Sequence, residues 1–150
     1  MEIEEVVRQH LQTGRMMQLA TSVNNQPWCC TVFFVPDDEF NLYWISKSET
    51  RHSKELIINT KAAVAIPIKF AVEGKRVGLQ IEGEAKVVEE IEEIKRGARL
   101  FSDRYQTGEI WYTDFVAGKN EHKLYKFRSK IFGVFDQENF PKSGRMEWMP

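Results

Sequence analysis

The sequence predicts a mainly β fold, a small barrel or closed sheet with helices at its periphery. Short runs rich in valine, isoleucine and aromatic residues recur along the chain, and clusters of turn-forming residues separate them. Helical patterns are confined to three segments. Because most strands follow one another without a helix between them, the pattern favours a small barrel over a parallel α/β sheet.

Two amphipathic helices frame the predicted strands. Apolar residues recur at helical spacing near the N-terminus and Gly14 supplies a stop, so a helix is expected over residues 2–13. A second apolar stripe follows Glu89 and Glu90, where acidic side chains suit the positive end of a helix dipole. A helix is therefore expected over residues 89–104.

Six or seven short strands are expected. They cover residues 16–23, 28–35, 42–46, 62–68 and 76–88, followed by two strands within 122–136. The first three are joined by turn clusters and predict a three-stranded meander. Pro67 indicates an edge or a bulge in the fourth, because proline cannot donate to a strand ladder. The fifth alternates apolar and polar residues, so we expect it to bury one face.

Length and composition limit the function classes. At 150 residues the chain is expected to form one domain, residues 1–150, large enough to bury a core. Its 21 basic residues nearly balance 22 acidic ones, so we expect no binding to nucleic acid or to an acidic membrane surface. Any anion site must therefore be local. No segment resembles a signal peptide or a membrane helix, and a cytoplasmic protein is expected.

Metal and nucleophile chemistry have little support in the sequence. The three histidines are far apart and no metal-ligand spacing occurs, so no metal site is expected. Cys29 and Cys30 are adjacent and would point to opposite faces of a strand, which argues against a disulfide between them. We expect both to be buried or half-buried structural thiols. Nucleotide-binding glycine motifs and catalytic serine motifs do not occur.

The segment SKSETRHSKEL, residues 46–56, carries the strongest chemical signal. If Thr50 caps a helix running to about Asn59, then Arg51, His52 and Lys54 crowd its first turn. Cations are disfavoured there by the helix dipole, and a bound anion would remove the conflict. First-turn N–H groups, nearby hydroxyls and the cationic side chains could together cradle a phosphate.

A second interpretation of this segment needs no ligand. The charges could be solvated at an exposed helix start, with Arg51 and Glu55 forming a weak ion pair one turn apart. The preceding strands favour the phosphate site, because they are rich in aromatic side chains that could wall a flat ring beside the anion. The alternative role of these side chains is ordinary barrel core. They are Trp28, Phe33, Phe34, Tyr43 and Trp44.

Over about residues 16–88 the sequence resembles the pyridoxamine-5′-phosphate-oxidase-like flavoproteins, the FMN-binding split β-barrels. The matching text is LATSVNNQPWCCTVFFVPDDEFNLYWIS followed by SETRHSKELIINTKAAVAI. Thr50-Arg51-His52 stands where the family has Ser-Arg-Lys, and Asn59-Thr60 where it has Asn-Pro. Together with Trp28-Cys29, the Thr-Arg-His turn is similar to a group of small uncharacterised members. The resemblance implies a split barrel of the FMN-binding type.

The resemblance also implies a cofactor and the residues that hold it. FMN is expected at the interface of a homodimer, with its phosphate on Thr50, Arg51 and His52. Ile45 and Ser46 would line the same end, and the isoalloxazine would lie beside the backbone of the second strand. The candidate cofactor-binding residues are Arg51, His52, Thr50, Ser46, Ile45, Thr31, Val32, Phe33, Lys54 and Gln80.

The sequence departs from the family pattern in three places. His52 replaces the usual lysine, so part of the charge on the phosphate would depend on pH. Gly78 stands where the true oxidase has a flavin-contacting glutamine, although Gln80 lies one pleat further along. The C-terminal SGRMEWMP lacks the Arg-Leu-x-Pro ending associated with binding pyridoxal phosphate. Oxidation of pyridoxamine phosphate is therefore not the expected activity.

Three functions fit these observations to different degrees. The first is an FMN-dependent oxidoreductase of unknown substrate, in which the flavin does the redox chemistry and no catalytic side chain is identified. The second is a non-catalytic module that stores or senses flavin or haem, with bulky side chains closing the barrel mouth. Candidates for such a lid, or for core or dimer interface, are Trp111, Tyr112, Phe115, Phe140 and Trp148. The third, a nucleic-acid-binding barrel, is the weakest because the net charge is near zero.

Overall fold

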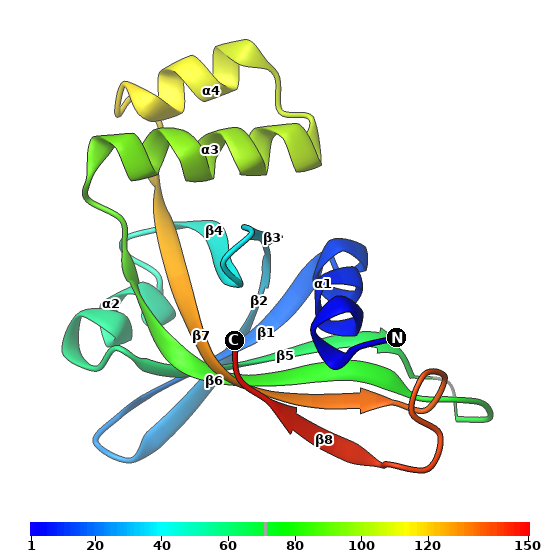
Figure 1. Ribbon diagram of the computed structural model, residues 1–150. Helices are drawn as coiled ribbons and strands as arrows, with labels where there is room; N and C mark the ends of the chain where they lie inside the picture. Colours follow the sequence, from blue (N-terminus) through cyan, green and yellow to red (C-terminus); the bar gives the residue numbers. More distant parts are fainter. Residues whose placement is uncertain (71) are drawn as a thin grey trace.

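A curled antiparallel sheet with four helices around it makes up the computed structural model of the protein, which describes residues 1–70 and 72–150 (Figure 1). The described helices are α1 (Ile3–Thr13), α2 (Arg51–Ile58), α3 (Ile91–Tyr105) and α4 (Glu109–Val116). The described strands are β1 (Met16–Val23), β2 (Gln26–Phe33), β3 (Val35–Pro36), β4 (Asn41–Lys47), β5 (Lys61–Lys69), β6 (Val77–Val87), β7 (His122–Asp136) and β8 (Arg145–Trp148). The predicted fold class, mainly β with peripheral helices, is confirmed.

The sheet curls into a half-barrel, and the chain connects its two end strands directly. Its strand order is β2-β1-β5-β6-β7-β4-β3, and β8 pairs with β7 outside this path. β2 and β3 lie at opposite ends of this order, yet only Phe34 separates them in sequence. Among the strands that the structure describes, β2 pairs with β1 alone, so its second edge is free. Pro27 in β2 suits this edge position.

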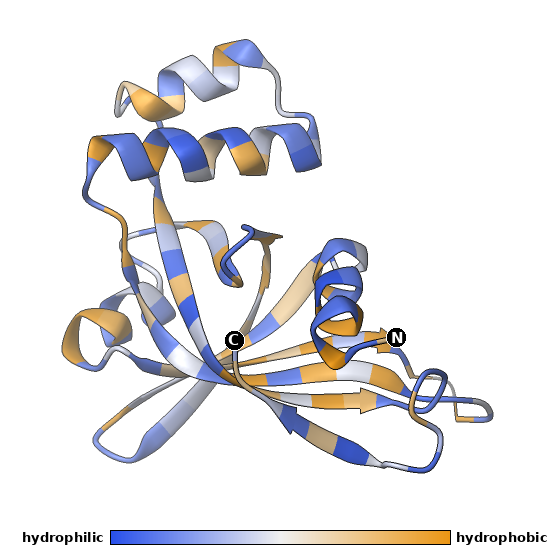
Figure 2. Ribbon diagram, in the orientation of Figure 1, coloured by the Kyte–Doolittle hydropathy of each residue, from blue (hydrophilic) through white to orange (hydrophobic). Residues whose placement is uncertain are grey.

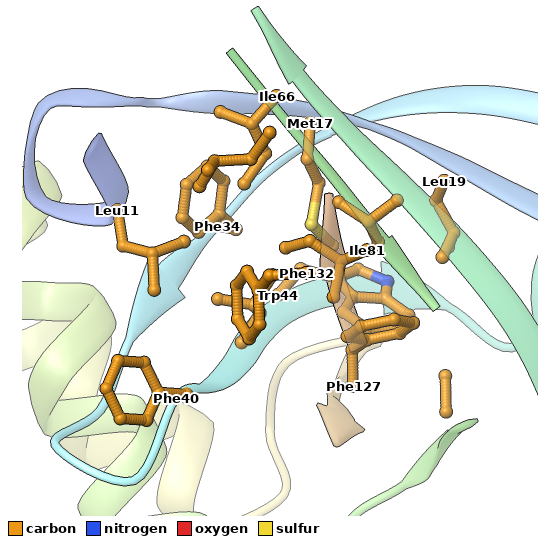
Figure 3. Close-up of a cluster of buried hydrophobic side chains, with 14 of the residues drawn as sticks. Leu11, Met17, Leu19, Phe34, Phe40, Trp44, Ile66, Ile81, Phe127 and Phe132 are labelled. Atoms are coloured by element: carbon orange, nitrogen blue, oxygen red, sulfur yellow. The ribbon is translucent and has the colours of Figure 1, made fainter. Parts of the chain in front are cut away.

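The core fills the inside of the curled sheet (Figure 3). Trp44, Phe34, Phe127 and Phe132 are its largest fully buried side chains. Each buried aromatic or aliphatic side chain contributes about 1.5–3 kcal/mol relative to an exposed one, so this cluster dominates the stability of the barrel. A second cluster lies beneath α3 and α4, which stack on one another at one side of the molecule in Figure 1.

Local sequence patterns predicted several elements closely. α1, β1 and α3 agree with their predicted ranges to within about two residues. Along β6, buried Leu79 and Ile81 alternate with exposed Gln80 and Glu82, as the period of two requires, and Figure 2 shows the same alternation in colour. The pairing of β5 with β6 shifts register just after Pro67, which confirms the expected bulge.

The predicted meander of the first three strands is wrong. Residues 28–35 divide at Phe34, which is fully buried and donates its N–H to the Arg15 carbonyl at 3.0 Å. β4 pairs with β3 over two residues and with β7 over seven, and no pairing between β4 and β2 occurs among the described strands. The predicted turn before β4 is therefore present, but the strand that pairs with β4 along its whole length is β7, from the C-terminal part of the chain.

The C-terminal part differs from the prediction in three ways. Residues 122–136 form one strand rather than two, because a register shift next to Gly83 lets β7 bend without a break. α4 is apolar on most sides and has no side-chain N-cap, so it lacks the usual helix signals. β8 spans four residues and is too short to show a period.

The bulky side chains suggested as a lid belong to packed clusters. Trp111 stacks on Phe115 with ring centroids 4.9 Å apart, and Trp148 meets Phe40 edge-on at the same distance. Both cysteines are free. Burial raises the pKa of the Cys30 thiol to about 11, as suits a structural residue. Cys29 is exposed, contrary to the prediction, because β2 is an edge strand.

Among the described helices, none combines the length and the hydropathy that crossing a bilayer requires.

Candidate functional site

The predicted phosphate segment forms a capped helix start. Thr50 is the N-cap of α2, and its Oγ1 accepts a hydrogen bond from the Ser53 backbone N–H at 3.3 Å. The first turn of a helix has no intrahelical acceptors for its N–H groups. Within the described chain, the backbone N–H groups of Arg51 and His52 have no hydrogen-bond partner. Two amides are therefore available to a ligand at this helix end.

His52 lies beneath this turn, with 8% of its surface exposed. Its Nε2 is 2.8 Å from Ser46 Oγ and 3.3 Å from Thr50 Oγ1. Burial lowers the pKa of His52 below its ordinary value of 6.5, against the opposing effect of the Glu55 carboxylate. At neutral pH the imidazole is therefore uncharged, and it fixes the positions of two hydroxyl groups.

Arg51 supplies the permanent charge of the helix start. Its Nε donates to Glu55 Oε2 at 2.9 Å, and its Cζ lies 4.1 Å from the centre of the Trp28 ring. Glu55 also accepts from Thr21 Oγ1 at 2.7 Å, and the bonds from Arg51 and Thr21 lower the pKa of this carboxyl. Glu55 thus holds the guanidinium at its Nε, and the Trp28 ring covers one of its faces.

The two Nη groups of Arg51 remain available to an anion. Neither has a hydrogen-bond partner in the part of the chain that the structure describes, and 47% of the side chain is exposed. Exposed Lys54 lies beside Arg51 in a shallow groove that Glu49 and Glu55 also line, whereas Lys47 pairs with Glu121 at 2.8 Å. Two amides, a guanidinium and an ammonium fit a phosphate monoester, because all four are donors and two carry positive charge.

β2 brings a free strand edge to this anion site. Trp28, on which Arg51 lies, is 40% exposed, and Phe33 at the other end of the strand is 55% exposed. A free edge presents backbone N–H and C=O groups, which suit a flat heterocycle with donors and acceptors along one side. The contact between Arg51 and Trp28 therefore brings the guanidinium at the start of α2 against a side chain of this edge strand.

The structure divides the aromatic side chains between the two roles considered for them. Phe34, Tyr43 and Trp44 are buried in the two core clusters. Trp28 and Phe33 stay exposed on β2. Of the aromatic side chains on the edge strand, Trp28 lies against Arg51, whereas Phe33 packs against Tyr105 at the other end of β2. The ordinary core role holds for the other three.

Other predicted site residues lie apart from the helix start. Gln80 is on β6, three strands away from β2, or about 14 Å at the usual strand spacing. Ile45 packs its side chain against the cluster under α3 and α4. Thr31 donates to Gln18 Oε1 at 2.6 Å, and Val32 packs against the main core.

The supports of Arg51 were only partly visible in the sequence. Helical spacing pairs Glu55 with Arg51, but the same pairing also fits an exposed helix start that binds no ligand. Thr21 precedes Glu55 by 34 positions, and no local pattern brings the two together. Trp28 was expected near a ring, but its contact with Arg51 depends on how β2 crosses α2.

A comparison with protein families agrees with the resemblance seen in the sequence. The family described as "Pyridoxamine 5'-phosphate oxidase" matches residues 3–128, most of the chain, including both α2 and β2. No curated protein matches the sequence.

Solved structures share the fold at low sequence identity. A conserved hypothetical protein from Mycobacterium tuberculosis matches with a TM-score of 0.77 and 17% identity, over 94% of this chain and 88% of that one. An FAD-binding protein from Mesorhizobium loti gives 0.65 and 13%, over 88% and 92%. HutZ, the haem storage protein from Vibrio cholerae, gives 0.67 and 18%, over 91% and 95%. At these sequence identities the similarity shows a shared fold.

Proposed function

The chain belongs to the pyridoxamine 5′-phosphate oxidase family, and we propose that it is an FMN-dependent oxidoreductase of unknown substrate. The observation that carries this proposal is the contact of Arg51 with Trp28, 4.1 Å from Cζ to ring centre, since it sets the guanidinium proposed to bind the phosphate against a side chain of the edge strand β2. A bound flavin would supply the hydride or electron transfer. The protein would bind the flavin and orient it.

Each residue of the helix start has a role in this proposal. Arg51 would bind the phosphate through its Nη groups, together with the free amides of the first turn. Ser46 and Thr50 hydroxyls would complete the cradle, held in place by neutral His52. The backbone of β2 would hydrogen-bond one side of the ring.

A homodimer with flavin at its interface is part of the proposal. Exposed apolar side chains near the site support it: Ile57 and Ile58 on α2 are 80% and 72% exposed, and Met16 beside Phe33 is 50% exposed. Figure 2 shows the hydrophobic colour on the outer turn of α2. Apolar surface of this kind is commonly covered by a partner. Two free cysteines fit the proposed cytoplasmic location.

A non-catalytic flavin- or haem-binding module is the second candidate. Its support is the similarity of the fold to HutZ, the haem storage protein. Reduction with NADH or NADPH separates the two candidates. An oxidoreductase should bleach its flavin absorption with a nicotinamide and recover it with oxygen or a dye, whereas a storage module should keep its spectrum.

The first test is the binding of FMN to the purified protein, followed by absorption and by titration calorimetry. Arg51→Ala should weaken FMN binding by more than about tenfold, because a charge-assisted bond to phosphate is lost. Arg128→Ala is the matched control, since Arg128 is an exposed arginine on β7 that pairs with Glu84. Equal loss in both variants, or no loss in Arg51→Ala, would contradict the phosphate assignment.

A further inference from the structure

Two paired residues of the sheet hold the two members of the ion pair at the start of α2. Thr21 on β1 and Trp28 on β2 lie directly opposite one another in the strand pairing. Thr21 Oγ1 donates to Glu55 Oε1 at 2.7 Å, and the Trp28 ring lies 4.1 Å from Arg51 Cζ. The side chains of Arg51 and Glu55 are therefore fixed to the sheet as well as to each other.

Burial separates Arg51 from the residues that support it. Thr21 is 3% exposed and Glu55 is 9% exposed. Each carboxylate oxygen of Glu55 already accepts a hydrogen bond, Oε1 from Thr21 and Oε2 from Arg51 Nε. The side chain of Arg51, by contrast, is 47% exposed. Of the ion pair, it is thus the guanidinium that faces an incoming ligand.

The charge of Glu55 opposes the anion proposed for this site. Hydrogen bonds from Arg51 and Thr21 lower the pKa of Glu55, so the carboxyl is ionised at neutral pH. A negative charge beside the guanidinium reduces the positive potential that a phosphate meets. If Glu55 acted through its charge alone, it would weaken phosphate binding. Its geometry offers a different contribution, which is to fix the orientation of a long side chain before the ligand arrives.

We propose that Thr21 and Glu55 are positioning residues that orient Arg51 for a phosphate monoester, an inference that rests on the proposed function. Thr21 holds the carboxylate, and the carboxylate holds Arg51 Nε. Trp28 covers one face of the guanidinium, which leaves the two Nη groups for the phosphate. Fixing one such side chain in advance improves affinity by about threefold to tenfold, because its rotamer freedom is not lost on binding.

Variants of Glu55 separate orientation from charge. Glu55→Ala removes both the charge and the acceptors, whereas Glu55→Gln removes the charge but keeps an oxygen that can accept from Arg51 Nε. Positioning predicts that Glu55→Ala binds FMN about threefold to tenfold more weakly than the unaltered chain, and that Glu55→Gln binds it more tightly than Glu55→Ala. Fluorescence titration of FMN measures each affinity. Tighter binding in Glu55→Ala than in the unaltered chain would overturn the proposal.

Variants of Thr21 test whether the effect passes through Arg51. Thr21→Val removes the hydroxyl without changing any charge and should weaken FMN binding by about threefold or more, whereas Thr21→Ser should bind FMN as the unaltered chain does. In an Arg51→Ala background, Thr21→Val should have no further effect. An equal loss in both backgrounds would show a merely structural role and overturn the proposal. Circular dichroism and thermal melting check that each variant is folded.

The same measurements distinguish failure of this inference from failure of the proposed function. If the unaltered chain binds no FMN, or if Arg51→Ala binds it equally well, the phosphate assignment fails and the positioning role fails with it. If Arg51→Ala weakens binding but Thr21→Val and Glu55→Ala do not, the phosphate assignment stands and the positioning role alone is refuted.

Discussion

At position 52, the exchange of the family's lysine for histidine changes how the helix start carries charge. A lysine there would remain protonated at every physiological pH. His52 instead lies under the turn with its Nε2 on Ser46, and burial lowers its pKa. The permanent positive charge is then concentrated on Arg51, which Glu55 and Trp28 hold in place. In the proposed phosphate site, Arg51 would therefore supply the permanent charge that a lysine at position 52 would otherwise share.

The lowered pKa of His52 predicts how stability depends on pH. The unfolded chain binds a proton with the ordinary pKa of 6.5, whereas the folded protein binds it only at lower pH. The unfolded state therefore carries more protons in this window, and the free energy of unfolding should fall as pH drops below about 6.5. His52→Gln should flatten this part of the profile in urea unfolding. A wild-type slope that persists in the variant would contradict it.

FMN affinity should respond to the same group in the opposite direction. A protonated His52 would add positive charge beneath the bound phosphate, so the wild-type protein should gain affinity relative to His52→Gln as the pH falls below the lowered pKa of His52. The comparison with the variant removes the contribution of the phosphate, which itself loses charge near pH 6. Fluorescence titration of FMN measures the affinity of the wild-type protein and of His52→Gln at each pH. A constant ratio of affinities from pH 5 to 8 would show that the imidazole does not sense the phosphate.

Among the elements, α3 is attached to the barrel by two adjacent residues at its C-terminal end. Arg104 donates to the carbonyls of Gln12 and Gly14, just beyond or at the end of α1. The Tyr105 hydroxyl lies within hydrogen-bond distance of the carbonyls of Arg15 and Phe34 and shares its one proton between them. α3 therefore holds both the end of α1 and the residue at which the chain crosses between the two ends of the sheet.

Tyr105→Phe should lower the free energy of unfolding by about 1–2 kcal/mol, because the Phe34 carbonyl loses a donor, whereas the Arg15 carbonyl still accepts from the Phe34 N–H. Tyr112→Phe is the control. The Tyr112 ring lies under Arg99, and its hydroxyl has no hydrogen-bond partner among the described residues. Chemical denaturation of both variants measures the difference. Similar losses in the two would show that the Tyr105 hydroxyl does not anchor α3.

Local patterns predicted the elements but not how they meet. The cap at Thr50 and the alternation in β6 depend on neighbours a few positions away, so sequence alone identified them. The bond from Tyr105 to Phe34 spans 71 positions, and the pairing of β4 with β7 spans more. For the same reason the cap and the cations of the helix start could be predicted from the sequence, whereas the contact of Trp28 with Arg51 required the fold.

At the scale of the whole molecule, the ends of the chain are tied together through the barrel. His10 Nε2 on α1 lies 2.7 Å from Asp136 Oδ2 at the end of β7, and Asp136 is fully buried. Asp136 also accepts from the Asn139 backbone and side chain in the turn that leads to β8. α1 and the C-terminal hairpin are therefore held to the same end of the sheet.

The proposed homodimer has a consequence for flavin binding. If a second copy completes the flavin site, the fraction of FMN bound at a fixed ratio to protein should fall more steeply on dilution than a single-site isotherm allows, because monomers bind less tightly. Fluorescence over an about thousandfold dilution, with sedimentation velocity in parallel, measures both events. If FMN binding still follows a single-site isotherm over the concentrations at which the dimer dissociates, one chain binds FMN alone.

The free edge of β2 has a second consequence, for solubility. An unpaired strand edge is a template on which strands of other chains can add. From Trp28 to Phe33 this edge has no proline and no charged residue to prevent such pairing. A ligand or a partner seated along β2 would shield it from this kind of aggregation. Cells short of the ligand would then lose the protein by precipitation, even while each chain remains folded.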